Sequence, residues 1–467
     1  MNSNKYKSLL LLLIIVALFN NTIIFAQAVQ YTTTANGLDK FKQTSLITTT
    51  LSPTDASIAT IQMDASKGFQ KMEGFGFALN GGSAALIDQL PSVKKQALLK
   101  EIFGKGKDDL GVNYIRISIG ASDLDAHVFS YDDLPKGETD SLLLKFSLSE
   151  DTLHLIPILK KALVINPSLK IMASPWSPPV WMKTNGFSMG GHLLKQYYAS
   201  YANYFVKYIQ SMQKQGIPIT SVTLQNEPEH GGNNPSMLMT ALEQNTFIKN
   251  HLGPAFKKQG IQTEIVIWDH NADNPNYPIQ ILNDSLAKSF ISASAFHLYL
   301  GHESALSKLH QAHPDKKIYF TEQWTGAKGN FAGDFIWHMQ HIVIGTMSNW
   351  SSMVLEWNLA NDPTYGPHTP GGCTECLGAL TIAGSDLKRN VSYYIIGQVA
   401  PFIPAGSVRI QTTSSNTQIQ SIGFKSADGK NVLVALNTGK EAVFTIDFEQ
   451  KKYNFTLPEK SASTIVW

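Results

Sequence analysis

The sequence predicts an α/β fold: a (β/α)8 TIM barrel accompanied by a small β-sandwich domain that the N- and C-terminal segments form together. Three observations support this prediction. Eight short β-rich runs alternate with longer helical patterns from Glu73 onward, which is typical of parallel βαβ units. Both flanks instead alternate with period two and are rich in Thr, Ser, Val and Ile. A doubly wound open sheet is the alternative, but the sequence has no G-x-G-x-x-G motif opening the first unit and no phosphate-binding loop.

The N-terminus has the pattern of an export signal. Lys5 and Lys7 precede an apolar run, Leu9 to Phe19, and the small residues of an Ala-Gln-Ala sequence follow at 26–28. A membrane anchor is the alternative, but the run is shorter than the roughly 20 residues that span a bilayer. We therefore expect residues 1–28 to be a cleaved signal peptide. The mature protein would be secreted or periplasmic, with no transmembrane segment.

The remaining chain divides into three parts. Residues 29–68 are expected to supply the N-terminal strands of the sandwich, residues 69–400 the catalytic barrel, and residues 401–467 the C-terminal strands of the sandwich. The C-terminal part contains alternating apolar runs such as Asn431 to Leu436, separated by turn residues. We expect both flanks to join in one antiparallel β-sandwich.

The barrel strands and helices follow from the change of hydrophobic period. Amphipathic helices are expected at Ser92 to Phe103, Leu153 to Leu163, Leu193 to Gln213 and Thr240 to Lys258, each ending in Gly, Pro or a polar turn. The eight strands are expected near Gly74 to Asn80, Tyr114 to Ile119, Lys170 to Ser174, Ser221 to Asn226, Glu264 to Trp268, Ala293 to Tyr299, Lys317 to Glu322 and Met353 to Asn358.

The composition restricts the class of ligand. Of the 467 residues, 43% are apolar and 16% are charged, and the formal net charge is +2. Such a chain is neither disordered nor an electrostatic nucleic-acid binder. A neutral ligand and no nucleic-acid partner are expected.

The two cysteines, Cys373 and Cys376, form a C-x-x-C sequence in a Gly- and Pro-rich loop. A four-ligand zinc site would need distant histidines, and thioredoxin-like chemistry would need the motif to open a helix after a strand. We therefore predict a disulfide that staples the loop locally, which an exported protein favours.

Two glutamates stand at predicted strand ends. Glu227 follows the fourth strand in Gln225-Asn226-Glu227-Pro228, and Glu322 closes the seventh in Phe320-Thr321-Glu322. TIM-barrel enzymes work at the carboxyl ends of their strands, and ends four and seven face each other across the mouth. Retaining glycosidases need two carboxyl groups roughly 5 Å apart. Each glutamate alone is more simply a solvated loop carboxylate or a structural ion pair, but together they favour catalysis.

Seven sequence blocks in this order resemble glycoside hydrolase family 30, the glucosylceramidase family, over essentially the whole mature length. The longest, residues 173–186, reads ASPWSPPVWMKTNG. The others are Gly74 to Phe77, Tyr114 to Leu124, Asn226 to Pro228, His297 to Tyr299, Thr321-Glu322 and Glu356 to Ala360.

The resemblance implies a catalytic pair, with Glu227 as acid/base and Glu322 as nucleophile, and it implies no metal or organic cofactor. It also implies that Asn226 bonds the sugar 2-hydroxyl and the nucleophile, that Asp123 and Trp176 hold hydroxyls at the far edge of glucose, and that Trp357 forms the floor under the ring. Tyr299 would donate to the nucleophile and Arg116 would support the pair electrostatically. Rim packing is the alternative for both tryptophans, and a structural ion pair is the alternative for Arg116.

Histidines are the remaining candidates for a metal site. His270, His297 and His302 lie in the same region, but their spacing matches no H-E-x-x-H or similar ligand pattern. We expect no metal.

The loop after the eighth strand departs from animal glucosylceramidases. Residues 361–368 and the C-x-x-C segment stand where we expect the aglycone, and they are more similar to bacterial relatives that include β-1,6-glucanases. Asp123 and Trp176 argue for glucose over the uronic-acid-directed xylanase branch. A secreted retaining β-glycosidase acting on a β-1,6-glucan or another β-glucoside is expected. The alternatives are a glucosylceramidase acting on glycolipid and a non-catalytic carbohydrate-binding protein, which would not need both glutamates.

Overall fold

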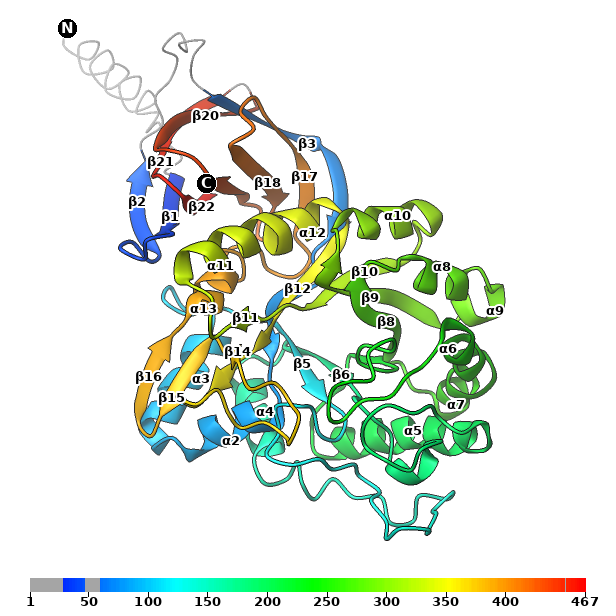
Figure 1. Ribbon diagram of the computed structural model, residues 1–467. Helices are drawn as coiled ribbons and strands as arrows, with labels where there is room; N and C mark the ends of the chain where they lie inside the picture. Colours follow the sequence, from blue (N-terminus) through cyan, green and yellow to red (C-terminus); the bar gives the residue numbers. More distant parts are fainter. Residues whose placement is uncertain (1–27, 47–58, 450) are drawn as a thin grey trace, which may run out of the picture.

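Eight parallel strands close into a barrel in the computed structural model, which describes residues 28–46, 59–449 and 451–467 (Figure 1). The predicted (β/α)8 fold class is confirmed. The predicted signal peptide lies, apart from Ala28, outside the described residues. The barrel strands are β4 (Gly74–Ala78), β5 (Tyr114–Ser118), β6 (Lys170–Ser174), β7 (Ser221–Thr223), β8 (Glu264–Ala272), β9 (Ile291–Gly301), β10 (Lys317–Glu322) and β12 (Ser351–Asn358).

The barrel strands are apolar because both of their faces are covered. Every residue of β4, β5 and β12 is buried, as expected for parallel strands enclosed by helices. Inside the barrel a separate layer packs together, formed by Tyr114, Met172, Val266, Ala293, Ala295, Tyr319, Met353 and Leu355. This packed interior leaves the carboxyl ends of the strands as the place for a site.

The helices surround the barrel, and the predicted boundaries hold best where a cap or a proline defines them. The helix α3 (Ser92–Phe103) has the predicted bounds. The others are α2 (Gly81–Gln89), α4 (Leu155–Ile165), α5 (Tyr198–Lys214), α6 (Ala241–Phe247), α7 (Gly253–Gln259), α8 (Asn276–Leu282), α9 (Ser285–Lys288), α10 (Ser304–Ala312), α11 (Phe331–Trp337), α12 (Thr346–Ser348) and α13 (Val391–Gly397), with short 3-10 turns at Val180–Met182 and Lys195–Tyr197 and π-helical turns at Ile248–Leu252 and His338–Gly345.

The helix predicted from Thr240 to Lys258 is continuous, but a π-helical turn separates its two α-helical parts. Thr240 and Glu243 form a capping box at its start. Pro254 has no N–H to donate one turn back, and the turn before it is π-helical. Gly260 closes the helix in the left-handed conformation.

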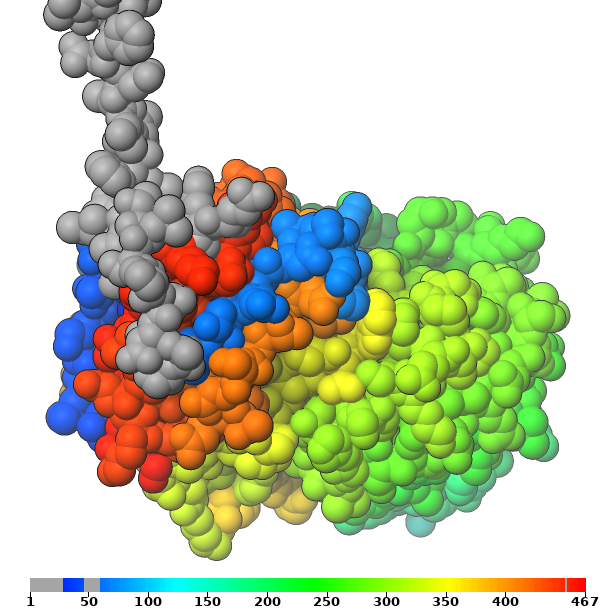
Figure 2. Space-filling view, turned by 90° about the horizontal axis from the view of Figure 1, so that it is seen from above, coloured from blue at the N-terminus to red at the C-terminus, as the bar shows by residue number. Residues whose placement is uncertain are grey.

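The second domain is one sheet of nine strands. Its N-terminal (blue) and C-terminal (orange to red) segments lie side by side, which confirms the predicted partnership of the two flanks (Figures 1 and 2). The sheet curls around its own apolar core, which includes Ile61, Leu433, Phe444, Phe455 and Ile465. Its order is β2-β1-β22-β19-β18-β17-β3-β20-β21. The bounds are β1 (Ala28–Thr34), β2 (Lys42–Leu46), β3 (Ala59–Lys71), β17 (Val408–Ser414), β18 (Ile419–Lys425), β19 (Asn431–Asn437), β20 (Ala442–Phe448), β21 (Lys451–Leu457) and β22 (Ser461–Val466).

One strand pair differs from the expected antiparallel arrangement. β3 pairs with β20 in parallel. β3 comes from the N-terminal flank, so no tight hairpin turn fixes its direction against the C-terminal strands. It ends at Lys71, past the predicted boundary at residue 68, and leads directly into β4.

A buried amide joins the sheet to the barrel. Gln398, which ends α13, donates from Nε2 to Thr33 Oγ1 (2.9 Å) and accepts at Oε1 from Thr464 Oγ1 (2.9 Å). Thr33 lies in β1 and Thr464 in β22, so one side chain holds both flanks of the chain against the barrel.

Two small sheets lie at the mouth. β11 (Thr325–Gly326) pairs with β14 (Cys376–Leu377), and β13 (Ala360–Asn361) pairs with β15 (Leu380–Ala383), which pairs with β16 (Asp386–Arg389). The loop between β13 and β14 is therefore attached to the strand that follows the seventh barrel strand. Within the described ranges, no helix is both long enough and apolar enough to cross a bilayer.

Candidate active site

Glu227 and Glu322 meet at the mouth of the barrel. Glu322 is the last residue of β10, and Glu227 follows β7. Both are buried, and one carboxylate oxygen of each lies within 4.8 Å of the other. The structure thus brings together the two glutamates that the strand-end argument selected.

The backbone beside Glu227 adopts an unusual conformation. Glu227 has φ 47°, and on the neighbouring strand β8, Trp268 and Asp269 have φ 72° and 64°. The left-handed region costs roughly 1 kcal/mol or more for a residue with a side chain. The Glu227 N–H donates to the Asp269 carbonyl (3.0 Å), and the register of β8 shifts at this point. This bulge turns the Asp269 side chain toward the carboxylate pair.

Arg116 on β5 donates hydrogen bonds to the carboxylates of Glu322 and Asp269. Its Nη1 donates to Glu322 Oε2 (2.5 Å), its Nη2 to Asp269 Oδ2 (2.8 Å) and to Asn226 Oδ1 (2.7 Å), and its Nε to Ser174 Oγ (3.1 Å). The guanidinium is fully buried. Burial opposes its charge, but Asp269 and Glu322 outweigh burial and raise the pKa of Arg116. Glu322 therefore has a permanent cation beside it.

His297 lies between three carboxylates. Its Nδ1 is 3.2 Å from Glu227 Oε1 and 3.9 Å from Glu322 Oε1, and its Nε2 is 3.2 Å from Asp269 Oδ1. Burial by itself disfavours the imidazolium, but the charges of Glu322 and the two hydrogen-bonded carboxylates raise the pKa of His297 to about 9. The ring is a cation at neutral pH.

The two glutamates bind protons as a pair. Burial opposes ionisation of Glu227, but the hydrogen bond and charge of His297 outweigh it and lower the pKa of Glu227. Burial raises the pKa of Glu322 despite the opposing charges of His297 and Arg116, and the negative charge of Glu227 adds to the effect. The pair therefore binds its first proton at a pH above the ordinary pKa range of a carboxyl group and its second proton at a pH below that range.

A cavity of about 380 Å³ opens over the pair. Glu322 Oε1 accepts a hydrogen bond from Tyr299 Oη (2.9 Å) at its edge. Trp176 and Trp357 lie with ring centroids 5.5 Å apart, and both rings contact the Arg116 guanidinium. The full lining is Asp123, Trp176, Glu227, His230, Asn233, His270, Asn271, Tyr299, Leu300, Glu322, Trp324, Trp357, Cys373 and Cys376.

The predicted sugar-binding residues divide into two groups. Asp123, Trp176, Tyr299 and Trp357 line the cavity together with the two glutamates. Arg116 and Asn226 instead lie behind the carboxylates, where Asn226 contacts Arg116 rather than Glu322. Neither side chain is part of the cavity lining, and the contact predicted between Asn226 and the sugar 2-hydroxyl stays a prediction.

The two cysteines are joined by a disulfide, and both line the cavity. The loop that carries them was expected at the aglycone position. In the structure Cys373 lies beside Asp123, with its N–H 3.3 Å from Asp123 Oδ2, and the aglycone position of the loop stays a prediction. The β11–β14 pairing holds the other end of the disulfide loop beside the seventh barrel strand.

Some residues of the site were missed by the sequence analysis. Asp269, which lies behind the cavity, follows the predicted fifth strand directly, so the strand-end argument that found Glu227 and Glu322 applies to it as well. The lining residues His230, Asn233 and Trp324 lie outside the barrel strands, and Asn271 and Leu300 lie where β8 and β9 extend beyond their predicted ends, so these five carry no such signal.

Metal binding can be considered for a single group of residues. Among the described residues, Glu227, His297 and Glu322 bring one ligand atom each within 4.8 Å of the others. Arg116 and the hydrogen bonds of His297 already occupy these atoms. Burial lowers the pKa of His270 to about 4, and His302 is exposed and bonds Ser304. The residues at the pocket fit acid–base and nucleophilic chemistry without a metal.

A larger hollow of about 730 Å³ lies outside the barrel between α3 and α4. Its lining includes Leu99, Ile156 and Val164 with three lysines, and it has no carboxylate. The chemistry therefore belongs to the smaller cavity.

Comparison with known proteins identifies the family of this chain. Residues 72–403 match the glycosyl hydrolase family 30 TIM-barrel domain and residues 406–465 match the family 30 beta sandwich domain. The chain is 34% identical to an endo-1,6-beta-D-glucanase of Neurospora crassa over 403 residues, 81% of each protein. It is 28% identical to the lysosomal acid glucosylceramidase of Mus musculus over 432 residues, 87% of this chain and 83% of that protein. A solved endo-beta1,6-glucanase superposes with a TM-score of 0.88 at 34% identity, covering 94% of this chain and 99% of that one. The chain therefore belongs to glycosyl hydrolase family 30 and is a glycosidase.

Proposed function

We propose that this enzyme hydrolyses β-1,6-linked glucan with retention of anomeric configuration, using Glu322 as nucleophile and Glu227 as acid/base. The observation that carries the mechanism is the carboxylate pair, whose oxygens approach within 4.8 Å. Retaining glycosidases have carboxyl groups about 5 Å apart, and inverting enzymes need about 6.5–9.5 Å to admit a water.

The contacts of the two carboxylates support this division of roles. Both oxygens of Glu322 accept hydrogen bonds, from Arg116 and Tyr299, which stabilise the anion that attacks. Glu227 shares its Oε1 with His297, and the other carboxylate oxygen is left to face a leaving group. An anion fixed by two donors suits a nucleophile, and a carboxyl group with one free oxygen suits a proton donor.

In the first step, a Glu322 oxygen attacks the anomeric carbon while the bond from that carbon to the leaving oxygen breaks. In the enzyme without substrate, the raised pKa of Glu322 and the lowered pKa of Glu227 put the single proton of the pair on Glu322, so the reacting complex is the form in which this proton has moved to Glu227. That proton goes to the leaving oxygen, so the aglycone departs as an alcohol and Glu227 becomes a carboxylate. In the second step, Glu227 takes a proton from water as the water attacks the same carbon. Glu322 leaves as a carboxylate, and the two inversions give net retention.

The pH dependence follows from the paired titration. The productive form has one proton on the pair, so activity should follow a bell whose acid limb lies below the ordinary pKa of 4.5 and whose alkaline limb lies above it. We expect His297→Asn to move both limbs to higher pH, because removing a cation raises the pKa of each carboxyl. Its maximal kcat/KM should fall about 10- to 100-fold with the loss of a charge-assisted hydrogen bond.

A pH–rate series for kcat/KM measures this shift. His270→Asn is the matched control for the alkaline limb, because His270 is neutral above its pKa of about 4 and its removal takes no charge from the pocket at neutral or alkaline pH. Limbs that stay in place in His297→Asn, or an alkaline limb that moves equally in both variants, would contradict the role given to the imidazolium.

The proposed substrate rests on the relatives. The Neurospora protein and the solved structure, each 34% identical, are described as endo-1,6-β-glucanases, whereas the mouse glucosylceramidase is 28% identical. The cavity is lined by tryptophans and by a buried carboxylate, Asp123, which suit the faces and hydroxyls of a neutral glucose. Glycolipid hydrolysis is the second candidate on the strength of that more distant relative.

A substrate panel distinguishes the two candidates. We expect β-1,6-glucan to be cleaved into oligosaccharides with the β-anomer appearing first in proton NMR spectra, and kcat/KM to exceed that for glucosylceramide at least tenfold. A matched β-1,3-glucan is the control and should be a poor substrate. Initial release of the α-anomer would refute retention, and faster turnover of glucosylceramide would transfer the assignment to glycolipid.

We also place the enzyme outside the cytoplasm. The N-terminal sequence pattern supports export, and the disulfide suits an oxidising compartment. N-terminal sequencing of protein recovered from the culture medium or periplasm is expected to begin near residue 28, and full-length protein confined to the cytoplasm would contradict export.

A further inference from the structure

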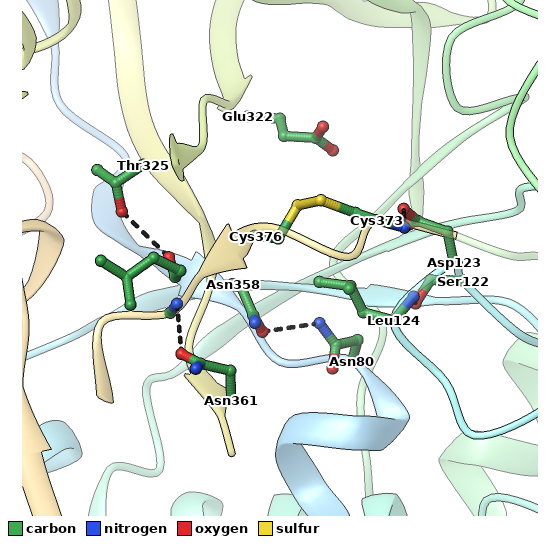
Figure 3. Close-up of a disulfide and its surroundings, with 12 residues drawn as sticks. Asn80, Ser122, Asp123, Leu124, Glu322, Thr325, Asn358, Asn361, Cys373 and Cys376 are labelled. Carbon is green, nitrogen blue, oxygen red and sulfur yellow. Dashed lines mark hydrogen bonds between the residues drawn. A yellow bond between two sulfur atoms is a disulfide. The ribbon is translucent and has the colours of Figure 1, made fainter. Parts of the chain in front are cut away.

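The disulfide loop is anchored on two sides of the sugar cavity (Figure 3). Cys376 begins β14 and pairs with Gly326, four residues beyond Glu322. Cys373, whose Cα lies 5.8 Å from that of Cys376, is on the side of Asp123, where its N–H donates to Asp123 Oδ2 (3.3 Å). The disulfide therefore bridges the strand that follows the seventh barrel strand and the carboxylate that follows the second.

The same loop also holds the Asp123 backbone. Thr369 donates its N–H to the Asp123 carbonyl (2.9 Å) and its hydroxyl to the Asn234 carbonyl, and Asn234 Nδ2 donates to the Pro370 carbonyl (2.8 Å). At Gly372 an added Cβ would lie 2.3 Å from the Asp123 carbonyl oxygen. Only glycine permits this approach, so the loop lies directly on the Asp123 segment.

The sulfurs belong to the cavity wall. Cys376 is buried in a cluster with Leu124, Trp176 and Trp357, and Cys373 packs at its edge. Both cysteines line the same cavity as Asp123 and Glu322. The disulfide thus faces the space over the catalytic carboxylates and is not a staple of a remote loop.

The Cys373 amide also affects the charge of Asp123. Burial and the charge of Glu322 raise the pKa of Asp123 to about 7, and the Cys373 amide acts against this shift. An ionised carboxylate is the stronger acceptor for sugar hydroxyls. Without the hydrogen bond from the Cys373 amide, the Asp123 carboxylate would be less firmly oriented and would be ionised to a smaller extent.

We infer that the Cys373–Cys376 disulfide is a positioning element of the sugar subsite, which fixes the Cys373 amide on the Asp123 carboxylate and closes the wall beside it. The inference rests on the proposed function, because that function assigns Asp123 to the bound sugar. Reduction of the disulfide weakens the binding of the sugar and leaves Arg116, Tyr299 and the glutamate pair in place.

The kinetic test compares oxidised wild type with Cys373→Ser/Cys376→Ser and with wild type reduced by dithiothreitol. On β-1,6-gluco-oligosaccharides we expect loss of the disulfide to raise KM about tenfold, because one charge-assisted hydrogen bond is lost. The change in kcat should be less than about threefold. Reoxidation should restore KM in the wild type. Thr374→Ala, an exposed residue between the two cysteines, is the matched control and should match wild type.

A double-mutant cycle tests whether the disulfide acts through Asp123. In an Asp123→Ala background, reduction should change KM less than about twofold, because the carboxylate that the loop positions is gone. Equal KM values in the oxidised and reduced enzymes, or an undiminished effect in the Asp123→Ala background, would overturn the inference and leave the disulfide as a purely structural staple.

Hydrogen exchange gives a readout that needs no substrate. On reduction, we expect faster amide exchange in peptides covering residues 121–126 and 369–376, and unchanged exchange in peptides covering Glu227 and Glu322. Unchanged exchange at 121–126 would overturn the inference. If exchange responds as expected but the oxidised enzyme cleaves no β-glucoside, the proposed function fails and the coupling of the disulfide to Asp123 stands.

Discussion

Replacing Glu322 by glycine is expected to lower kcat on β-glucosides by roughly 10⁵-fold, because no covalent glycosyl-enzyme can form without the nucleophile. The vacated space lies beside Arg116 and Tyr299, which held the carboxylate and now face an opening large enough for a small anion. Added azide should therefore attack the anomeric carbon from that side and restore turnover of an activated aryl β-glucoside. The product should be the α-glycosyl azide, identified by NMR.

Glu227→Gly should give the opposite stereochemistry. The glycosyl-enzyme still forms from a substrate with a good leaving group, and azide then attacks from the face that Glu227 has vacated, which yields the β-glycosyl azide. Loss of the acid/base should lower kcat about 10²- to 10⁴-fold for a poor leaving group and far less for a good one.

Glu229 provides the matched control for both variants. It lies in the same loop as Glu227 but is exposed and bonded to Asn274. Glu229→Gln should keep kcat within about twofold of wild type. A β-azide from Glu322→Gly, or comparable losses in all three variants, would refute the assignment of the two roles.

The sequence predicted the barrel well because its strands are continuous apolar runs, but strand ends at the site were less predictable. β7 ends at Thr223, three residues before the predicted end, and β8 continues to Ala272, beyond the predicted end at Trp268. The bulge at Trp268 and Asp269 places two non-glycine residues in the left-handed region. No Gly or Asn marks this turn, so local propensity gave no signal for it.

The meeting of Glu227 and Glu322 at the mouth was predictable because the end of a strand is a local property. The network behind it was not, because Arg116 and Asp269 are 153 positions apart and meet only when the barrel closes. Likewise, the C-x-x-C spacing favours a local disulfide, but the contact of Cys373 with Asp123 depends on the β11–β14 pairing across the mouth. The family resemblance supplied Arg116 and Tyr299 as partners of Glu322, whereas Asp269 and the position of His297 between the carboxylates were missed.

The second large effect is expected when the buried guanidinium group of Arg116 is removed. Arg116→Met should lower the free energy of unfolding by about 3–5 kcal/mol, because it removes the cation that, together with His297, compensates the buried charges of Glu322 and Asp269. Burial opposes the ionisation of Asp269, and Arg116 is the main reason that the pKa of this carboxyl is held well below its usual range. Urea unfolding followed by tryptophan fluorescence measures the loss, and kcat/KM should fall about 10²- to 10³-fold.

Two further variants separate charge from geometry. Arg116→Lys keeps one positive charge, but a single ammonium group cannot span Glu322, Asp269 and Asn226 as the planar fork does, so its losses should be smaller than those of Arg116→Met but still clear. Arg389→Met is the matched control: Arg389 makes a two-pronged ion pair with Glu101 (2.7 and 2.6 Å) away from the cavity, and its side chain is 36% exposed. Its removal should lower the free energy of unfolding by about 1 kcal/mol or less and leave kcat/KM unchanged. If Arg116→Met unfolds at the same urea concentration as Arg389→Met and keeps its activity, Arg116 is not the residue that compensates the buried carboxylates.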